Sequence, residues 1–383
     1  MSVKENSDIK IMTPGPTQVA ENVYHARSLR TTNPDLDPQF YDFYRDTCRL
    51  FGKLIHTENP CFILGGEGIL GLEAACASLT EPGDRVLVID NGIFGKGFAD
   101  FVSVYQGEPV VWSLDYHNPL TKEKLRNYLE KDHDFKYATI VHSDTPTGLL
   151  NPVEQLCPVL KEYGILTVAD SVTGMFADEL NVDEAQIDIV CGGSQKALSA
   201  PPGLTMVAVS REAFQAMHDR KTPIRSFYAN LLTFETYYED QWFPYTMPVS
   251  DIMGLRQALE NVAADTQQLA RHGKIASAAR KALTDAGLTL YLESGFASSV
   301  TVFYVPEGMK AQEILDTMVK KHHIMIAGCF DILAGKVLRI GHMGNNANIA
   351  DMTETLSALA DTLKELGFVL KADPAERFLA YVE

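Results

Sequence analysis

The sequence predicts an α/β fold with a mostly parallel sheet, followed by a smaller α+β unit. Between residues 60 and 210, short apolar runs alternate with amphipathic stretches. Strands that alternate with helices form parallel sheets with both faces covered. Beyond residue 250 a long helical pattern is followed by fewer and more scattered apolar runs. That change of rhythm indicates a second, smaller unit.

The elements are expected in the following order. Pro14-Gly15-Pro16-Thr17 prevents regular structure, so residues 1–20 should form an extended arm. A helical period begins near Asp37. The apolar runs that we expect to be strands are 61–64, 85–90, 109–112, 138–142, 165–169, 187–191 and 204–209. Helices are expected between them, for example at 71–79, 120–129 and 152–163.

The C-terminal third begins with one helical pattern from 251 to 286, interrupted weakly at Gly273. Residues 298–305 and 337–340 have strand patterns, and residues 311–321 and 351–366 have helical ones. We therefore expect an N-terminal arm (1–20), a large α/β domain (21–255) and a C-terminal part (256–383). The last part would contain the long linking helix and a small domain.

Composition and charge exclude several classes of protein. The 383 residues include 50 acidic and 33 basic ones, so the net charge is −17. Such a surface argues against binding nucleic acid or anionic membrane. No apolar run reaches the roughly 18 residues of a spanning helix, and the polar N-terminus lacks a secretory signal. The six scattered cysteines indicate free thiols, and no metal-ligand spacing occurs, so a cytoplasmic protein without a metal is expected.

Polar and glycine residues follow five of the predicted strands. In parallel sheets, ligands bind at the carboxyl ends of the strands, so a site is expected where these segments meet. The segments are Gly65–Gly68, Asp90–Gly92, His142–Thr145, Asp170–Ser171 and Gly192–Lys196.

One of these segments, Gly66 to Gly71, has the literal pattern GxGxxG, and Asp90 follows at the end of the next strand. This is the fingerprint of a dinucleotide site, with pyrophosphate at the helix N-terminus and the acid on a ribose. Two features argue against NAD. The strand lies about 60 residues into the chain, and Glu67 places a carboxylate where phosphate oxygens would bind. The alternative is a plain helix start, with Glu67 favoured by the helix dipole.

Lys196 is a candidate nucleophile because glycines before it and prolines after it hold its loop at the end of a buried-type strand. A desolvated lysine has a lowered pKa and can form a Schiff base with an aldehyde. An aldehyde cofactor acting as an electron sink also needs a carboxylate for its ring nitrogen and a flat side chain against the ring. Asp170 and Phe94 could supply these, although a helix cap and a core phenylalanine are the simpler interpretations. A single lysine in a loop is usually a solvated surface charge, and the setting of Lys196 is what favours the chemical role.

The segment Gly193-Ser194-Gln195-Lys196-Ala197-Leu198-Ser199-Ala200-Pro201-Pro202-Gly203 resembles the lysine loop of class V, fold type I aminotransferases. The similarity is to the alanine–glyoxylate and serine–pyruvate group. It covers nearly the whole chain, from Pro14-Gly15-Pro16 to Arg339-Ile340-Gly341. It implies a pyridoxal 5'-phosphate (PLP) enzyme with a large α/β domain and a small C-terminal domain. It also implies amino and 2-oxo acids as substrates.

The resemblance assigns a role to each matching residue. Lys196 would hold the cofactor and move protons, Asp170 would pair with the ring nitrogen, and Arg339 would bind the substrate carboxylate. The segment with Tyr245 and Thr246 would reach the neighbouring subunit's site, which implies a homodimer or homotetramer. Further cofactor contacts are expected from Gly66, Glu67, Gly68, Phe94, Thr145, Val172 and Gln195.

Glu67 sets this chain apart from most of the family, which has a small residue there. At roughly 4 Å, a carboxylate would repel each unit of phosphate charge by a few kcal/mol. The pyridoxamine–pyruvate aminotransferases, which the chain resembles around Glu67 and Arg339, use unphosphorylated pyridoxamine or pyridoxal as a substrate. The predicted reaction is therefore pyridoxamine plus pyruvate to pyridoxal plus L-alanine. The alternative is a PLP-cofactored alanine or serine aminotransferase acting on glyoxylate or pyruvate.

Two weaker alternatives remain from the same residues. Class V includes cysteine desulfurases, and Cys329 lies ten residues before Arg339. However, Gln195 precedes the lysine, where desulfurases usually have histidine. A non-catalytic vitamin B6 sensor is also conceivable, but the joint presence of Lys196, Asp170 and Arg339 favours catalysis.

Overall fold

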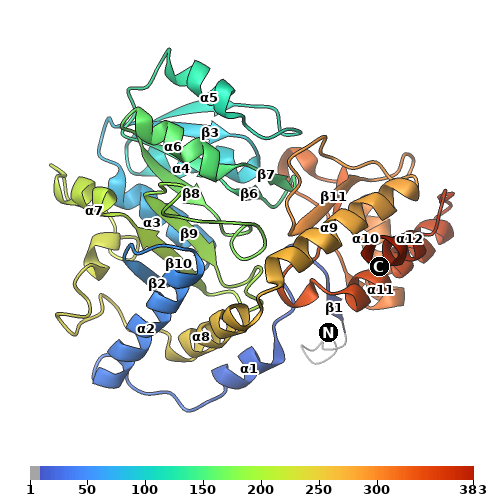
Figure 1. The fold of residues 1–383 in the computed structure, drawn as a ribbon, viewed down its shortest axis with the longest axis horizontal. Coiled ribbons are helices and arrows are strands. Elements are labelled where there is room, and N and C mark those ends of the chain that lie inside the picture. The colour runs from blue at the N-terminus through green and yellow to red at the C-terminus, as the bar shows by residue number, and fades with distance from the viewer. Residues whose placement is uncertain (1–8) are drawn as a thin grey trace.

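The computed structural model describes residues 9–383, so residues 1–8 of the predicted arm lie outside the described part. A large body and a smaller C-terminal body lie side by side (Figure 1). The large body is built on a seven-stranded sheet in the order β2-β10-β9-β8-β5-β3-β4. β10 runs antiparallel to both neighbours and the remaining pairs are parallel, which confirms the mostly parallel sheet. The strands are β2 (Cys61–Gly65), β3 (Arg85–Asp90), β4 (Glu108–Ser113), β5 (Tyr137–Val141), β8 (Leu166–Asp170), β9 (Ile189–Gly193) and β10 (Leu204–Val209).

Helices surround this sheet. They are α1 (Glu21–Arg27), α2 (Pro38–Leu54), α3 (Gly68–Leu79), α4 (Ile93–Val104), α5 (Lys122–Leu129), α6 (Val153–Glu162) and α7 (Arg211–His218). The first of them, α1, packs mainly on helix α8 (Val249–Ala264). α3 packs closely on β9 and β10 because it is apolar and rich in small residues. A Cβ at Gly71 would lie 2.5 Å from the Thr205 Oγ1 atom, so only glycine permits this approach. The site lies at the N-terminal end of α3, which this packing holds in place.

The connection between the two bodies differs from the prediction. Instead of one helix over 251–286, the chain forms α8 (Val249–Ala264) and α9 (Gln268–Asp285). The break falls at Asp265, whose carboxylate accepts a hydrogen bond from the Gln267 N–H (3.1 Å) and pairs with Arg271 (2.6 Å). Such local side-chain bonds compete with helix propagation. Gly273, where a weak interruption was expected, lies inside α9.

The smaller body contains an antiparallel pair, β11 (Val300–Tyr304) with β13 (Val337–Gly341). Helices α10 (Ala311–His322), α11 (Ile349–Glu365) and α12 (Pro374–Val382) accompany it. Its buried apolar residues form a cluster of their own, distinct from the cluster that surrounds the large sheet. The domain limits at residues 20 and 255 stay a prediction.

The N-terminal arm joins the smaller body to the large one. Residues Lys10–Ile11 form β1, which pairs in parallel with β12 (Ile324–Met325). Downstream of β1, the arm contacts the large body, where the Thr17 N–H donates to the Gln195 carbonyl (3.1 Å).

Two further short strands, β6 (Ser143–Asp144) and β7 (Leu149–Leu150), form a hairpin beside the site. Within residues 9–383, no helix combines the length and the apolarity needed to cross a membrane.

Candidate active site

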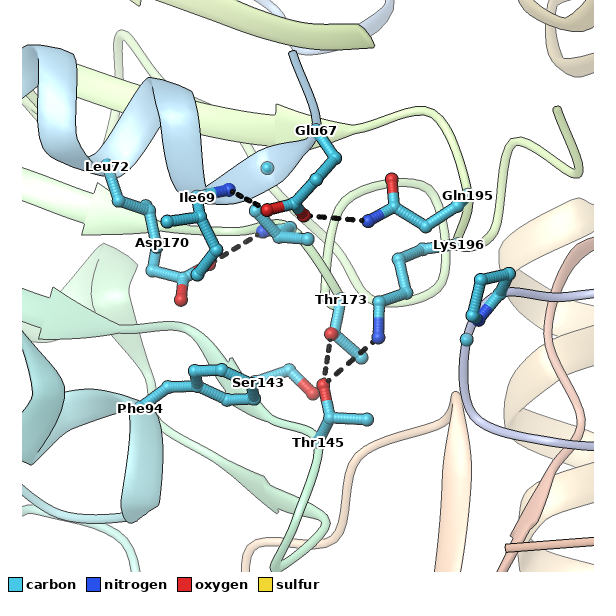
Figure 2. A pocket seen from close by; sticks show the side chains of 14 residues that line it. Glu67, Ile69, Leu72, Phe94, Ser143, Thr145, Asp170, Thr173, Gln195 and Lys196 are labelled. Atoms are coloured by element: carbon cyan, nitrogen blue, oxygen red, sulfur yellow. Dashed lines mark hydrogen bonds between the residues drawn. The ribbon is translucent and has the colours of Figure 1, made fainter. Parts of the chain in front are cut away.

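A cavity of about 170 Å³ lies at the carboxyl ends of β8 and β9, beside the first turn of α3 (Figure 2). It is the place where the sequence predicted a site from the polar strand ends. Eight of the predicted residues line it together, namely Glu67, Gly68, Phe94, Thr145, Asp170, Val172, Gln195 and Lys196.

Lys196 points into this cavity from the loop after β9 (Figure 2). Its Nζ atom donates to the Pro14 carbonyl (2.7 Å) and lies 3.5 Å from the Thr145 Oγ1 atom. Burial, which penalises the ammonium form, and the nearby Arg339 together lower the pKa of Lys196 to about 8. A large fraction of Lys196 is therefore neutral at mildly alkaline pH, as a nucleophile or proton acceptor must be.

Asp170 ends β8 and is buried, with 5% of its surface exposed. Its Oδ1 atom accepts a hydrogen bond from the Val172 N–H (2.9 Å), and its other oxygen faces the cavity (Figure 2). Burial raises the pKa of Asp170 to about 7. A cationic N–H donor in the cavity would stabilise the carboxylate and lower this pKa. The arrangement fits a protonated pyridine nitrogen.

Arg339 lies on β13 of the smaller body and is next to Thr145, which lines the cavity, although Arg339 itself is not one of the lining residues. Its Nε atom donates to the Gly328 carbonyl (2.7 Å), and its Nη1 atom lies 3.4 Å from the Thr145 carbonyl. No carboxylate among residues 9–383 forms an ion pair with it, so the guanidinium is not committed to a salt bridge. A carboxylate of a small substrate is the chemical partner for which such a buried guanidinium is suited.

Phe94 and Val172 form apolar walls of the cavity. Phe94 is fixed at the start of α4, where its N–H donates to the Asp144 Oδ1 atom (3.0 Å). This bond requires glycine at position 92, because a Cβ there would lie 2.4 Å from the Asp144 carboxyl carbon. A flat aromatic ring fits against such a wall.

Glu67 is the N-cap of α3. Its Oε1 atom accepts a hydrogen bond from the Ile69 N–H, and its Oε2 atom accepts one from the Gln195 Nε2 atom, both at 3.2 Å (Figure 2). The helix N-terminus, which in many proteins binds phosphate, is here engaged by the protein's own carboxylate.

Three predicted residues lie elsewhere. Gly66 forms the turn before the helix cap and does not line the cavity. Tyr245 stacks on Tyr228 with ring centroids 4.3 Å apart, and Thr246 is exposed and donates to Asp35 (3.3 Å). The part of Tyr245 and Thr246 in a neighbouring subunit's site stays a prediction.

The structure also brings to the site residues that the sequence did not assign to it. The arm crosses Lys196 so closely that a Cβ at Gly15 would lie 2.5 Å from the Nζ atom. Gly15 has a φ of +118°, which favours glycine independently. Thr173 bonds the Thr145 hydroxyl, and Ser143 lines the cavity. The Pro-Gly-Pro motif was the available signal for the arm, but only its lack of regular structure was inferred.

The geometry argues against two of the alternatives. Asp90 accepts hydrogen bonds from the Ser113 hydroxyl (2.7 Å) and the Tyr116 hydroxyl, so both carboxylate oxygens are engaged within the protein instead of facing a ribose site. Cys329 is partly buried, and burial raises the pKa of its thiol. A thiol with a raised pKa supplies little of the thiolate that a desulfurase needs.

The seven-stranded sheet, the smaller C-terminal body and a cavity lined by both a lysine and a buried aspartate are those of the fold type I, PLP-dependent transferases. The chain belongs to the class V aminotransferases, whose family description, "Aminotransferase class-V", matches residues 18–330. Membership implies dependence on PLP and the use of amino and keto acids. The site residues fit this group, since Asp170, Lys196 and the apolar walls suit a pyridine aldehyde.

Individual relatives narrow the group. The chain is 34% identical to an uncharacterized aminotransferase of Methanocaldococcus jannaschii, covering 96% of this chain and 95% of that protein. It is 29% identical to the pyridoxamine–pyruvate transaminase of Mesorhizobium japonicum, with 96% and 95% covered. The solved pyridoxamine–pyruvate aminotransferase from Mesorhizobium loti superimposes with a TM-score of 0.93 at 27% identity, covering 98% and 97%. The ureidoglycine–glyoxylate aminotransferase from Bacillus subtilis also has a TM-score of 0.93, at 26% identity and 97% of both chains.

Proposed function

We propose that this aminotransferase moves the amino group of unphosphorylated pyridoxamine to pyruvate, which yields pyridoxal and L-alanine. The observation that carries the proposal is the position of Glu67. Its carboxylate occupies the N-terminus of α3, held there by the Ile69 N–H and the Gln195 carboxamide. The similarity to pyridoxamine–pyruvate aminotransferase, in sequence and in structure, supports the same substrate.

The physical reason is competition for one set of donors. A phosphate ester carries a charge of about −1.5 to −2 at pH 7 and needs several N–H donors. Two donors at this end of the cavity already bind Glu67, and the carboxylate itself repels the phosphate by a few kcal/mol per unit charge. A hydroxymethyl group is neutral and donates a hydrogen bond, which Glu67 can accept. The same residue therefore favours one vitamer and rejects the other.

The remaining residues supply the chemistry of amino transfer. A bound pyridine aldehyde or amine supplies the electron sink that makes the substrate's α-proton removable. Lys196, in its neutral form, is placed to accept that proton at its Nζ atom and return it. Asp170 keeps a proton on the ring nitrogen through its cavity-facing oxygen. Arg339 holds the substrate carboxylate and so orients the α-carbon toward Lys196.

A PLP-cofactored enzyme acting on alanine or serine with glyoxylate or pyruvate is the second candidate. The family's dependence on PLP favours it, as does the match to a glyoxylate aminotransferase. Glu67 is exposed at the cavity mouth, and a rotation of its side chain would free the helix N-terminus.

An absorption titration with pyridoxal and with PLP, each followed by L-alanine, separates the two candidates. The proposal expects pyridoxal to bind and to be released as pyridoxamine after alanine is added. Tight binding of PLP together with no binding of pyridoxal would overturn it. In that case the second candidate is correct.

Replacement of Glu67 tests the selectivity directly. Glu67→Ser keeps an N-cap residue, so α3 should remain folded. Without the carboxylate, the affinity for PLP relative to pyridoxal should rise at least about 100-fold, the equivalent of a few kcal/mol of lost repulsion. The matched control is Glu123→Ser, at an exposed glutamate in the first turn of α5. Equal relative affinities in the wild type and Glu67→Ser would show that Glu67 does not select the vitamer.

A further inference from the structure

Two buried threonines meet at the side of the cavity that lies opposite Glu67. Thr173, on the loop after β8, forms a hydroxyl–hydroxyl hydrogen bond with Thr145, which lies between β6 and β7 (Figure 2). Both residues line the cavity, and each has at most 4% of its surface exposed within this chain. Their contact therefore does not depend on a neighbouring subunit.

The protons of the two hydroxyls have a preferred order. A threonine hydroxyl donates one proton and accepts through two lone pairs. Thr145 is the partner that the structure shows for the Thr173 hydroxyl among residues 9–383. The Lys196 Nζ atom also lies 3.5 Å from the Thr145 Oγ1 atom, and an ammonium only donates. If Thr173 donates to Thr145, the Thr145 proton is available to an acceptor that binds beside Lys196. The reverse order would leave the Thr173 proton buried without that acceptor, which costs free energy.

The four sides of the cavity match the ring of a vitamin B6 compound. Asp170 and Lys196 lie on opposite sides, and Glu67 and Thr145 lie on the two remaining sides (Figure 2). In these vitamins the reactive carbon is attached opposite the ring nitrogen. A ring hydroxyl flanks it on one side, and the hydroxymethyl or phosphate arm flanks it on the other. With the nitrogen at Asp170 and the arm at Glu67, the ring hydroxyl would face Thr145.

We infer that Thr173 is a positioning residue that makes Thr145 a hydrogen-bond donor to the ring hydroxyl of the bound vitamin. By donating to the Thr145 oxygen, Thr173 orients that hydroxyl and strengthens it as a donor, because hydrogen bonds in a chain polarise one another. Such a donor favours the ring oxygen most when that oxygen is ionised. The inference rests on the proposed roles of Lys196 and Asp170, and it holds for either vitamer.

The test compares binding of pyridoxamine with binding of 3-deoxypyridoxamine, an analogue that carries hydrogen in place of the ring hydroxyl. Neither amine forms a Schiff base with Lys196, so calorimetry measures the contacts alone. The ratio of the two affinities isolates the hydroxyl contact, because a general loosening of the site weakens both ligands. The phosphorylated pair is measured in parallel, and the ratio is read with whichever pair binds. Failure of the unphosphorylated pair alone overturns the proposed vitamer and not the role of Thr173.

Three variants isolate the Thr173 hydroxyl. Thr173→Val keeps the shape of the side chain and should lower the affinity ratio about fivefold, the size expected for one hydrogen bond. Thr173→Ser retains a hydroxyl and should keep the wild-type ratio. Thr355→Val is the matched control, because Thr355 is a buried threonine of α11 whose hydroxyl donates to the Asp351 carbonyl (2.7 Å). It should keep the ratio whatever its effect on stability.

Thr145→Val shows whether Thr173 acts through Thr145. It should lower the ratio at least as much as Thr173→Val does. The double variant should match Thr145→Val alone, because effects that pass through one group do not add. An unchanged ratio in Thr173→Val, an equal loss in Thr173→Ser or Thr355→Val, or an additive loss in the double variant would overturn the inference. If neither pair of amines binds the wild type, the proposed function fails together with it.

Discussion

At the scale of single residues, burial gives ordinary side chains their chemical properties. Lys196 and Asp170 are common residue types, and their pKa values move to about 8 and about 7 because the cavity removes water from both. The sequence predicted that polar residues follow the strands and that these residues lie together at one edge of the sheet. Their hydrogen-bond partners were not visible, because Pro14, Thr173 and Gly328 contribute atoms that no local pattern relates to the site.

The lowered pKa of Lys196 predicts the pH dependence of amino transfer. Only the neutral amine accepts a proton, so the rate with L-alanine should increase as the pH rises through about 8, and it should be low at pH values well below 8. Folding stability should also rise with pH, because the folded protein holds this lysine at a lower pKa than the unfolded chain does. The unfolded lysine stays protonated up to about 10.5, so this group's contribution to folding stability grows between about pH 8 and 10.5.

Single-turnover rates between pH 6.5 and 9.5 test this prediction. Lys196→Arg serves as the matched variant, because a guanidinium stays charged throughout this range. It should reduce the rate at least about 1000-fold, since both the nucleophile and the proton acceptor are lost. A flat profile, or substantial activity of Lys196→Arg, would contradict the assignment of Lys196.

At the scale of elements, a buried carboxylate joins several of the pieces that support the site. Asp188 precedes β9 and is 1% exposed. It accepts hydrogen bonds from the Thr167 N–H of β8 (2.8 Å), the Ser210 hydroxyl before α7 (2.8 Å) and the Lys161 ammonium of α6 (2.7 Å). One side chain therefore holds two helices against the strand that carries Asp170.

Asp188→Asn should lower the free energy of unfolding by about 3 kcal/mol, because it leaves the lysine without its partner and disrupts buried hydrogen bonds. The control is Asp316→Asn, which breaks an exposed pair with Lys320 and should cost less than about 0.5 kcal/mol. Urea denaturation of both variants measures the difference. Equal destabilisation would show that the Asp188 network does not support the sheet.

The elements themselves were predictable to different degrees. Strands such as 85–90 and 204–209 were found with their observed limits, because strands buried on both faces are continuous apolar runs. Helix α4 was not assigned, since Gly95 and Gly97 weaken the helical signal in its first turns. The break at Asp265 was missed, because the apolar period continues across it and only a side-chain turn interrupts the backbone.

At the scale of the whole molecule, the N-terminal arm couples the two bodies through the reactive lysine. Met12 belongs to the apolar cluster of the smaller body, and its carbonyl accepts from the Gly341 N–H (2.8 Å). Two residues later, the Pro14 carbonyl accepts from Lys196 (2.7 Å). A relative movement of the two bodies would therefore displace an atom that is bonded to the lysine.

Gly15→Ala tests this coupling. The added Cβ would lie 2.5 Å from the Lys196 Nζ atom, so the lysine must move, and a displacement of this size can reduce the rate about 100-fold. Gly83→Ala provides the control, because Gly83 also has a positive φ (+83°) and a Cβ there meets no atom within 4 Å. Both kcat and the melting temperature are measured for the two variants. Backbone strain should lower the melting temperature of both, whereas the contact with Lys196 should lower kcat only in Gly15→Ala. If both variants lose activity equally, the arm has no specific effect on Lys196.

The sequence by itself determined the layered α/β fold, the sheet edge that carries the site and the family to which the chain belongs. These follow from periodicity and from contiguous motifs such as the lysine loop, which are properties of neighbouring residues. Tertiary structure alone decided that Glu67 is held by Gln195, that Gly15 packs on Lys196 and that Thr173 bonds Thr145. These contacts join residues separated by up to 181 positions along the chain. Such pairings depend on how packed elements meet in space, and no local pattern records them.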